Sequence, residues 1–203
     1  MYDLTLQTML FQGLSLLIIA AVNGFVVSLV SKALGDPGPA YDGRLTLNPF
    51  PAVDILGALG ALVFALGWIK PVVLTPKDLQ PRGWGAAAIV LAGSLAVAIL
   101  AVLVSLLLPV VALTFPSTGA PLGQDFIAKF VHAALGFALV NLIPLPPLAG
   151  GYLLDALWPA GAAFLRKYAI IVGIVLLGLL ATGYPTLIAD FIIAPAVSSL
   201  MHT

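Results

Sequence analysis

The sequence predicts an all-α membrane protein with four to five transmembrane helices. Hydrophobic residues make up 62% of the 203 residues and charged residues only 8%, whereas a soluble domain carries about 25% charge. Several apolar runs approach or exceed the ~20 residues that cross a bilayer as a helix. Glycine and proline clusters separate these runs without any longer polar region. Residues 1–203 are therefore predicted to form a single integral membrane domain.

Four apolar runs are predicted to span the membrane. They cover about residues 4–31, 84–113, 124–143 and 164–182. The tail, 186–203, is also apolar, but Pro195 interrupts it, so we expect this segment to lie at the membrane interface. Turn signals follow the first run, and residues 44–47 are predicted to contribute to a short β-hairpin.

Residues 51–68 form a short apolar run that either spans the membrane or enters it and returns. Lysine and arginine favour the cytoplasmic side, so their distribution helps to choose. If the run spans, the cations divide into Lys70, Lys77, Arg82, Arg166 and Lys167 against Lys32, Arg44 and Lys129. If it returns, Lys129 alone lies on one side of the membrane and the other seven cations lie on the opposite side. The second division is more one-sided, so it favours a re-entrant segment, with the N-terminus outside.

Composition also excludes several kinds of function. The net charge is zero and no basic stripe is present, which argues against nucleic acid as a partner. The chain has no cysteine, so disulfides, thiol catalysis and thiolate metal sites are excluded. All eight acidic residues are aspartate, and the two histidines are His132 and His202. Chemistry that needs a glutamate base therefore has no residue to perform it.

Five short strings occur in order along residues 10–185. They are Leu34-Gly-Asp36, Gly43-Arg-Leu-Thr-Leu-Asn-Pro49, Gly67-Trp-Ile-Lys-Pro71, Leu91-Ala-Gly93 and Asn141-Leu-Ile-Pro followed by Leu-Ala-Gly-Gly151. Together they resemble the short bacterial members of the site-2 protease family, peptidase family M50. The resemblance implies a site-2-protease-like core and a location in the bacterial inner membrane. Members of that family are intramembrane zinc metalloproteases.

The resemblance also implies where a zinc site would lie, and the ligands are missing there. Counting back from Leu34-Gly-Asp36, the family's His-Glu-x-x-His window falls on Asn23, Gly24 and Val27, and its aspartate ligand falls on Ala149. In the family motif two histidines share a helix face, and the glutamate activates zinc-bound water. The chain is therefore predicted to be a pseudoprotease with no catalytic residue, no metal and no cofactor.

The proline-rich segment that follows residues 124–143 is a second candidate site. Proline lacks a backbone N–H and breaks the helix, and open backbone at membrane depth must be covered or line a cavity. In active relatives this stretch resembles a clamp for an unwound strand. Here it either still holds a strand or a partner helix, or only maintains the fold. The residues concerned are Asn141, Pro144, Pro146, Pro147, Gly150 and Gly151.

Two polar residues within apolar runs have alternative interpretations. His132 is a possible ligand for a pigment, haem or metal, because an ionisable residue within a span suggests a function. Alternatively, it forms a hydrogen bond near the membrane interface. Asn23 is either a remnant of the zinc site or an inter-helix hydrogen-bonding residue.

These observations predict a non-catalytic, multi-pass membrane protein that binds or scaffolds another membrane protein. It is expected to be an accessory subunit of a larger hetero-oligomeric complex, in contact with membrane lipid and other integral membrane proteins. Two alternatives stay open: an intramembrane zinc metalloprotease of the M50 family, and a pigment-binding, cofactor-binding or transport subunit.

Overall fold

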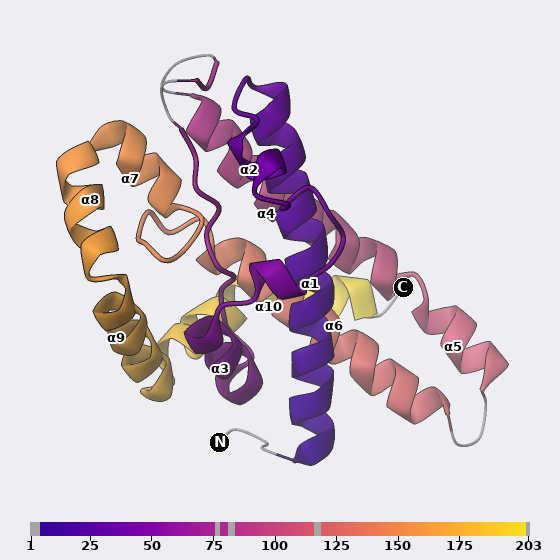
Figure 1. The fold of residues 1–203 in the computed structure, drawn as a ribbon. Coiled ribbons are helices and arrows are strands. Elements are labelled where there is room, and N and C mark those ends of the chain that lie inside the picture. Colours follow the sequence, from indigo (N-terminus) through magenta and orange to yellow (C-terminus); the bar gives the residue numbers. More distant parts are fainter. Residues whose placement is uncertain (1–4, 76–77, 81–83, 116–118, 202–203) are drawn as a thin grey trace.

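The computed structural model describes residues 5–75, 78–80, 84–115 and 119–201, and their regular structure is helical (Figure 1). The helices are α1 (Leu6–Ala33), α2 (Gly38–Tyr41), the 3-10 helix η1 (Phe50–Ala52), α3 (Ile55–Phe64), α4 (Gly85–Ser105), α5 (Leu108–Thr114), α6 (Ala120–Val140), α7 (Gly151–Leu157), α8 (Pro159–Lys167), α9 (Ala169–Ala181) and α10 (Tyr184–Met201). Three helical stretches are long and apolar enough to cross a membrane: α1, α4 together with α5, and α10. The prediction of an all-α membrane protein is therefore confirmed.

Helices α1, α4 and α6 pack against one another and form the core. Each of them contributes side chains that are almost fully buried: Ile19, Ala20, Val97, Ala101, Phe130 and Ala134. Gly93 lets α4 approach α1 closely, because a Cβ atom there would lie 2.9 Å from both Asn23 Nδ2 and Val27 Cγ2. Small residues at such crossings allow helices in lipid to pack through their backbones.

The segment between α1 and α4 leaves α1 at its C-terminal end and returns to the same end. The Gln80 N–H donates to the Leu34 carbonyl at 2.8 Å, although 46 residues separate them. Helix α3 lies within this excursion and has ten residues, which is about 15 Å against a hydrocarbon core of ~30 Å. This geometry favours a re-entrant segment over a fifth span.

The β-hairpin predicted near residues 44–47 is not formed. These residues make bends, and the described part of the chain has only one isolated antiparallel bridge, between Val53 and Ile69. Side chains compete with strand pairing here, because Thr46 Oγ1 accepts from the Asn48 N–H and Asn48 Oδ1 accepts from the Phe50 N–H. Such local bonds favour turns over a ladder.

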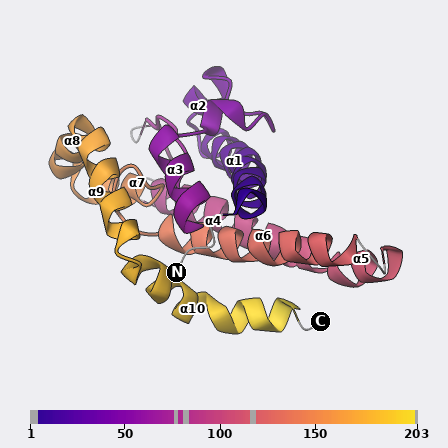
Figure 2. The same cartoon turned by 90° about the horizontal axis from the view of Figure 1, so that it is seen from below.

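The second half of the chain departs from the predicted spans. Helices α8 and α9 meet at 80°, so residues 164–182 are not one straight helix. The tail is the regular helix α10, which runs back along α6 (Figure 2). Helix α6 is not among the stretches that are apolar enough to span, since its first two thirds carry Gln124, Asp125, Lys129 and His132. The number of spans and the interfacial position of the tail stay predictions.

Replacing Gly93 with leucine is expected to destabilise the protein by about 1–3 kcal/mol, because overpacking forces α4 away from α1. Unfolding in mixed micelles measures this change. The control is Gly178→Ala in α9, where an added Cβ meets nothing within 4 Å. Equal stability of the two variants would contradict the close α1–α4 contact.

Candidate functional site

Three of the four zinc-site positions inferred from the resemblance line one small cavity. Its volume is about 10 Å³, and it lies between α1, the 141–150 loop and the extended segment 69–75. Its wall includes Asn23, Val27, Asn141, Ala149 and Tyr152. Gly24 does not face this cavity, since a Cβ atom at Gly24 would contact the Ala52 side chain.

A zinc ion does not fit the residues that surround this cavity. Val27 and Ala149 carry no side-chain donor atom, and Asn23 offers only a neutral amide. Within the described residues, no three histidine, cysteine, aspartate or glutamate side chains lie close enough to share a metal ion. Zinc sites in proteins need three or four such ligands. Positions that the resemblance assigns to a zinc site therefore lie around one cavity, but their side chains do not have the chemistry of zinc ligands.

Asn141 joins the end of α6 to the loop that follows. Its Nδ2 donates to the Phe137 carbonyl at 2.9 Å, and its Oδ1 accepts from the Ala149 N–H at 3.2 Å. Its own carbonyl accepts from the Gly150 N–H at 2.7 Å. A Cβ atom at Gly150 would lie 2.1 Å from the Ile143 carbonyl oxygen, so only glycine fits there. The proline-rich loop is thus closed upon itself around one buried amide.

The extended segment 69–75 crosses the cavity and is held by three backbone hydrogen bonds. The Lys70 N–H donates to the Ala52 carbonyl at 2.8 Å, the Val72 N–H donates to Tyr152 Oη, and the Thr75 N–H donates to Asp36 Oδ2 at 2.6 Å. Asp36 is fully buried and also accepts from the Gly38 N–H. Two of the three acceptors are side chains that lie far away in the sequence.

Sequence reasoning missed Tyr152 and the role of Asp36. Tyr152 lies 80 residues from Val72 and follows the Gly-Gly pair directly, and nothing in its local pattern indicates a hydrogen bond. In the sequence, Asp36 stands out only as part of the Leu34-Gly-Asp36 string. An acidic residue directly after a long apolar helix was the available signal, because buried carboxylates require donors.

A larger cleft of about 280 Å³ lies beside the small cavity. One wall is the extended backbone of residues 71–74, and the other contains Pro146, Pro147 and Gly151 from the predicted clamp. Pro144 and Gly150 are not part of its wall. The cleft also contains an ion pair between Asp155 of α7 and Arg166 of α8.

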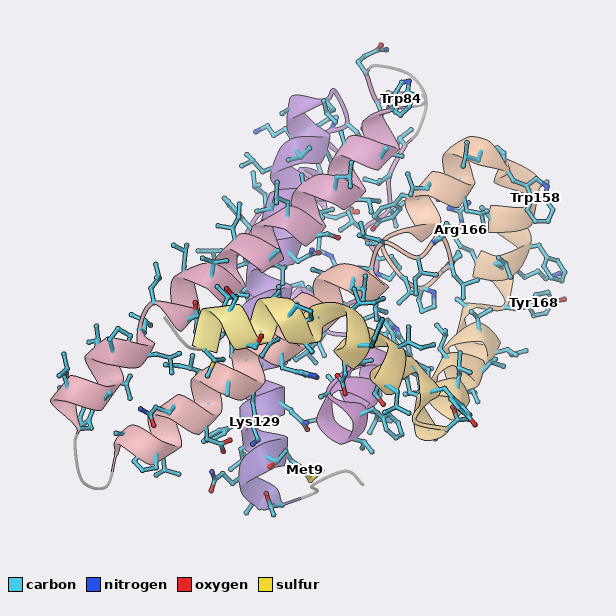
Figure 3. All side chains as sticks on the ribbon, turned by 180° about the vertical axis from the view of Figure 1, so that it is seen from behind. Met9, Trp84, Lys129, Trp158, Arg166 and Tyr168 are labelled. Atoms are coloured by element: carbon cyan, nitrogen blue, oxygen red, sulfur yellow. The ribbon has the colours of Figure 1, made fainter. Side chains whose placement is uncertain are left out.

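The Asp155–Arg166 pair connects the first two helices of the α7–α9 arm. Arg166 lies on the inner side of this arm, whereas Trp158 and Tyr168 lie on its outer side (Figure 3). Burial raises the pKa of the Asp155 carboxyl, and the neighbouring Arg166 guanidinium opposes that shift. The pair therefore places both charges at one end of an otherwise apolar cleft.

His132 lies away from both cavities and contacts the last helix. Its Nε2 lies 2.6 Å from Asp190 Oδ1, so the pair joins α6 to α10. The two side chains border a separate open pocket between the end of α3 and the α9–α10 corner. A ligand bound through Nε2 would have to displace Asp190.

Comparison with curated proteins identifies a similar chain. It is a Bacillus subtilis (strain 168) protein named "Putative zinc metalloprotease YwhC". The two sequences are 28% identical over 162 residues, which is 77% of this chain and 73% of the relative. No family model and no solved structure matches the chain. The likeness is consistent with a site-2-protease-like family.

Replacing Asn141 with leucine, which has similar volume, is expected to cost about 1–3 kcal/mol of stability. The change removes the acceptor of the Ala149 N–H and one of the two donors to the buried Phe137 carbonyl, which also accepts from the Asn141 backbone N–H. Hydrogen exchange at Ala149 and Gly150 should accelerate together with the loss of stability. The control is Thr114→Val, because the exposed Thr114 hydroxyl bonds only within its own helix. If both variants behave alike, Asn141 does not hold the loop.

Proposed function

We propose that this protein is a non-catalytic, site-2-protease-like membrane protein that binds a segment of another membrane protein. The observation that carries the proposal is the contrast between the two neighbouring cavities. Around the small cavity, Val27 and Ala149 occupy the positions of metal ligands, and the chain has no glutamate. The adjacent cleft of about 280 Å³ keeps a wall of extended backbone opposite the proline-rich loop.

The extended wall has the properties of a strand edge that accepts a second strand. Val72 is buried, whereas the neighbouring Val73 side chain is 75% exposed. Within the described residues, the backbone N–H and C=O groups of Val73 make no hydrogen bond. Open backbone groups beside pockets for alternate side chains are typical of sites that bind peptides by strand addition. We propose that the occupant is an extended segment of a partner membrane protein.

The setting that we propose is an accessory subunit of a hetero-oligomeric complex in the bacterial inner membrane. Large apolar side chains are exposed along α9 and α10, including Ile170, Val175, Leu187, Ile188 and Phe191. In a membrane these side chains contact lipid or another membrane protein. The division of cations proposed from the sequence places the cleft toward the cytoplasmic side, because Arg166 and Lys70 lie near it.

Of the two alternatives, the zinc metalloprotease is favoured by the name of the Bacillus subtilis relative. The donor atoms around the small cavity disfavour it. The pigment-binding alternative depends on His132, whose Nε2 contacts Asp190. We therefore place strand or segment binding ahead of both.

Site-directed cross-linking tests the proposal, and the absence of cysteine makes each introduced thiol unique. A photo-reactive group on the Val73→Cys variant should yield one discrete adduct in native membranes. The control is Ile170→Cys, which is similarly exposed at 72% but lies on α9, away from the cleft. A Leu74→Trp change, which fills the cleft, should greatly reduce the Val73→Cys adduct.

Two outcomes would contradict the proposal. One is the same set of adducts from both cysteine positions, which would indicate random collisions in the membrane. The other is an adduct at Val73→Cys that Leu74→Trp does not reduce, because the partner would then not occupy the cleft.

A further inference from the structure

We infer that a single water molecule occupies the small cavity and bonds to Asn23, Tyr152 and Asn141. This inference deepens the proposed non-catalytic function and rests on it. It concerns the position where the resemblance places zinc, and it assigns that position a different occupant with a structural role.

The Asn23 side chain has a buried amide that lacks a hydrogen-bond partner among the described residues. This side chain is 2% exposed and lines the cavity. Within the described residues, no group donates to its oxygen or accepts from its nitrogen. Buried side-chain polar groups nearly always bond to protein or to ordered water. Because protein partners are absent, water is the partner that remains.

The Tyr152 hydroxyl group can donate a hydrogen bond into the same cavity. Its oxygen accepts from the Val72 N–H, which leaves the hydroxyl hydrogen available for donation. Tyr152 is buried and lines the same cavity as Asn23. None of the described residues accepts this hydrogen. The cavity therefore brings together one unsatisfied amide and one unsatisfied hydroxyl donor.

The size and lining of the cavity match one water molecule. Its volume of about 10 Å³ corresponds to roughly one water molecule, which also needs two to four polar partners. Asn23 and Tyr152 supply two, and Asn141 Oδ1 keeps a second lone pair after accepting from the Ala149 N–H. Val27, Ile69 and Ala149 form apolar wall and leave no room for a larger ligand.

The water has a structural consequence, because its partners come from different parts of the fold. Asn23 belongs to α1, Asn141 ends α6, and Tyr152 belongs to α7 and holds the segment 69–75. The water thus connects α1 to the proline-rich loop and, through Tyr152, to the wall of the binding cleft. A hydrogen-bonded cross-link takes the place that a metal cross-link has in the family.

A double-mutant cycle in the 203-residue chain tests this inference. Asn23→Leu and Tyr152→Phe should each lower Tm by about 3 to 8 °C through lost buried hydrogen bonds. Combined, they should lower Tm by clearly less than the sum, because either change alone removes the shared water. The matched control combines Tyr152→Phe with Ser31→Ala, whose hydroxyl bonds to its own helix, and these two effects should add. Additive effects in the Asn23–Tyr152 pair would overturn the inference.

A high-resolution structure of the unaltered protein provides a second readout that does not depend on variants folding. One isolated water peak about 3 Å from the Asn23 amide and from Tyr152 Oη is expected. An empty cavity would overturn the inference and leave the proposed function intact. A peak with anomalous scattering at the zinc edge would overturn both.

Discussion

The backbone break after α6 is the constraint on which the rest of the structure depends. A chain that opens its backbone inside a membrane must satisfy each freed N–H and C=O group within the protein. Here backbone–backbone bonds, such as that from the Gly150 N–H to the Asn141 carbonyl, satisfy much of the loop, and the Asn141 side chain adds bonds to the Phe137 carbonyl and the Ala149 N–H. The loop can then turn back, and α7 can begin where Tyr152 reaches the segment 69–75. Without this closure neither cavity would have its walls.

The two cavities share a wall but differ in what they can do. The small one contains positions that the resemblance assigns to a metal site, and its polar side chains include two amides and one phenol hydroxyl. The larger one is bounded by the backbone of residues 71–74 and by the proline-rich loop. Its walls therefore do not depend on the presence of metal ligands. Fold alone does not determine function, so the proposal of a binding subunit depends on the side-chain donor atoms around the small cavity.

The sequence was most informative where one local pattern decides the structure. The long apolar runs predicted α1 and α4, and three prolines in four residues predicted the break after α6. Local reasoning failed at residues 44–47, where the Thr46 and Asn48 side chains bond to nearby backbone. It also missed the Tyr152–Val72 bond and the His132–Asp190 pair, which join residues 80 and 58 positions apart. Contacts across such separations depend on the path of the whole chain, such as the 80° bend between α8 and α9.

We propose that the position where the resemblance places zinc does not bind the metal, and metal analysis of the purified protein tests this. The protein would be produced with zinc supplied and then dialysed against a weak chelator. We expect well below one zinc per chain, and the same zinc content in an Asn23→Leu variant. One zinc per chain that survives dialysis and is lost on Asn23→Leu would contradict it.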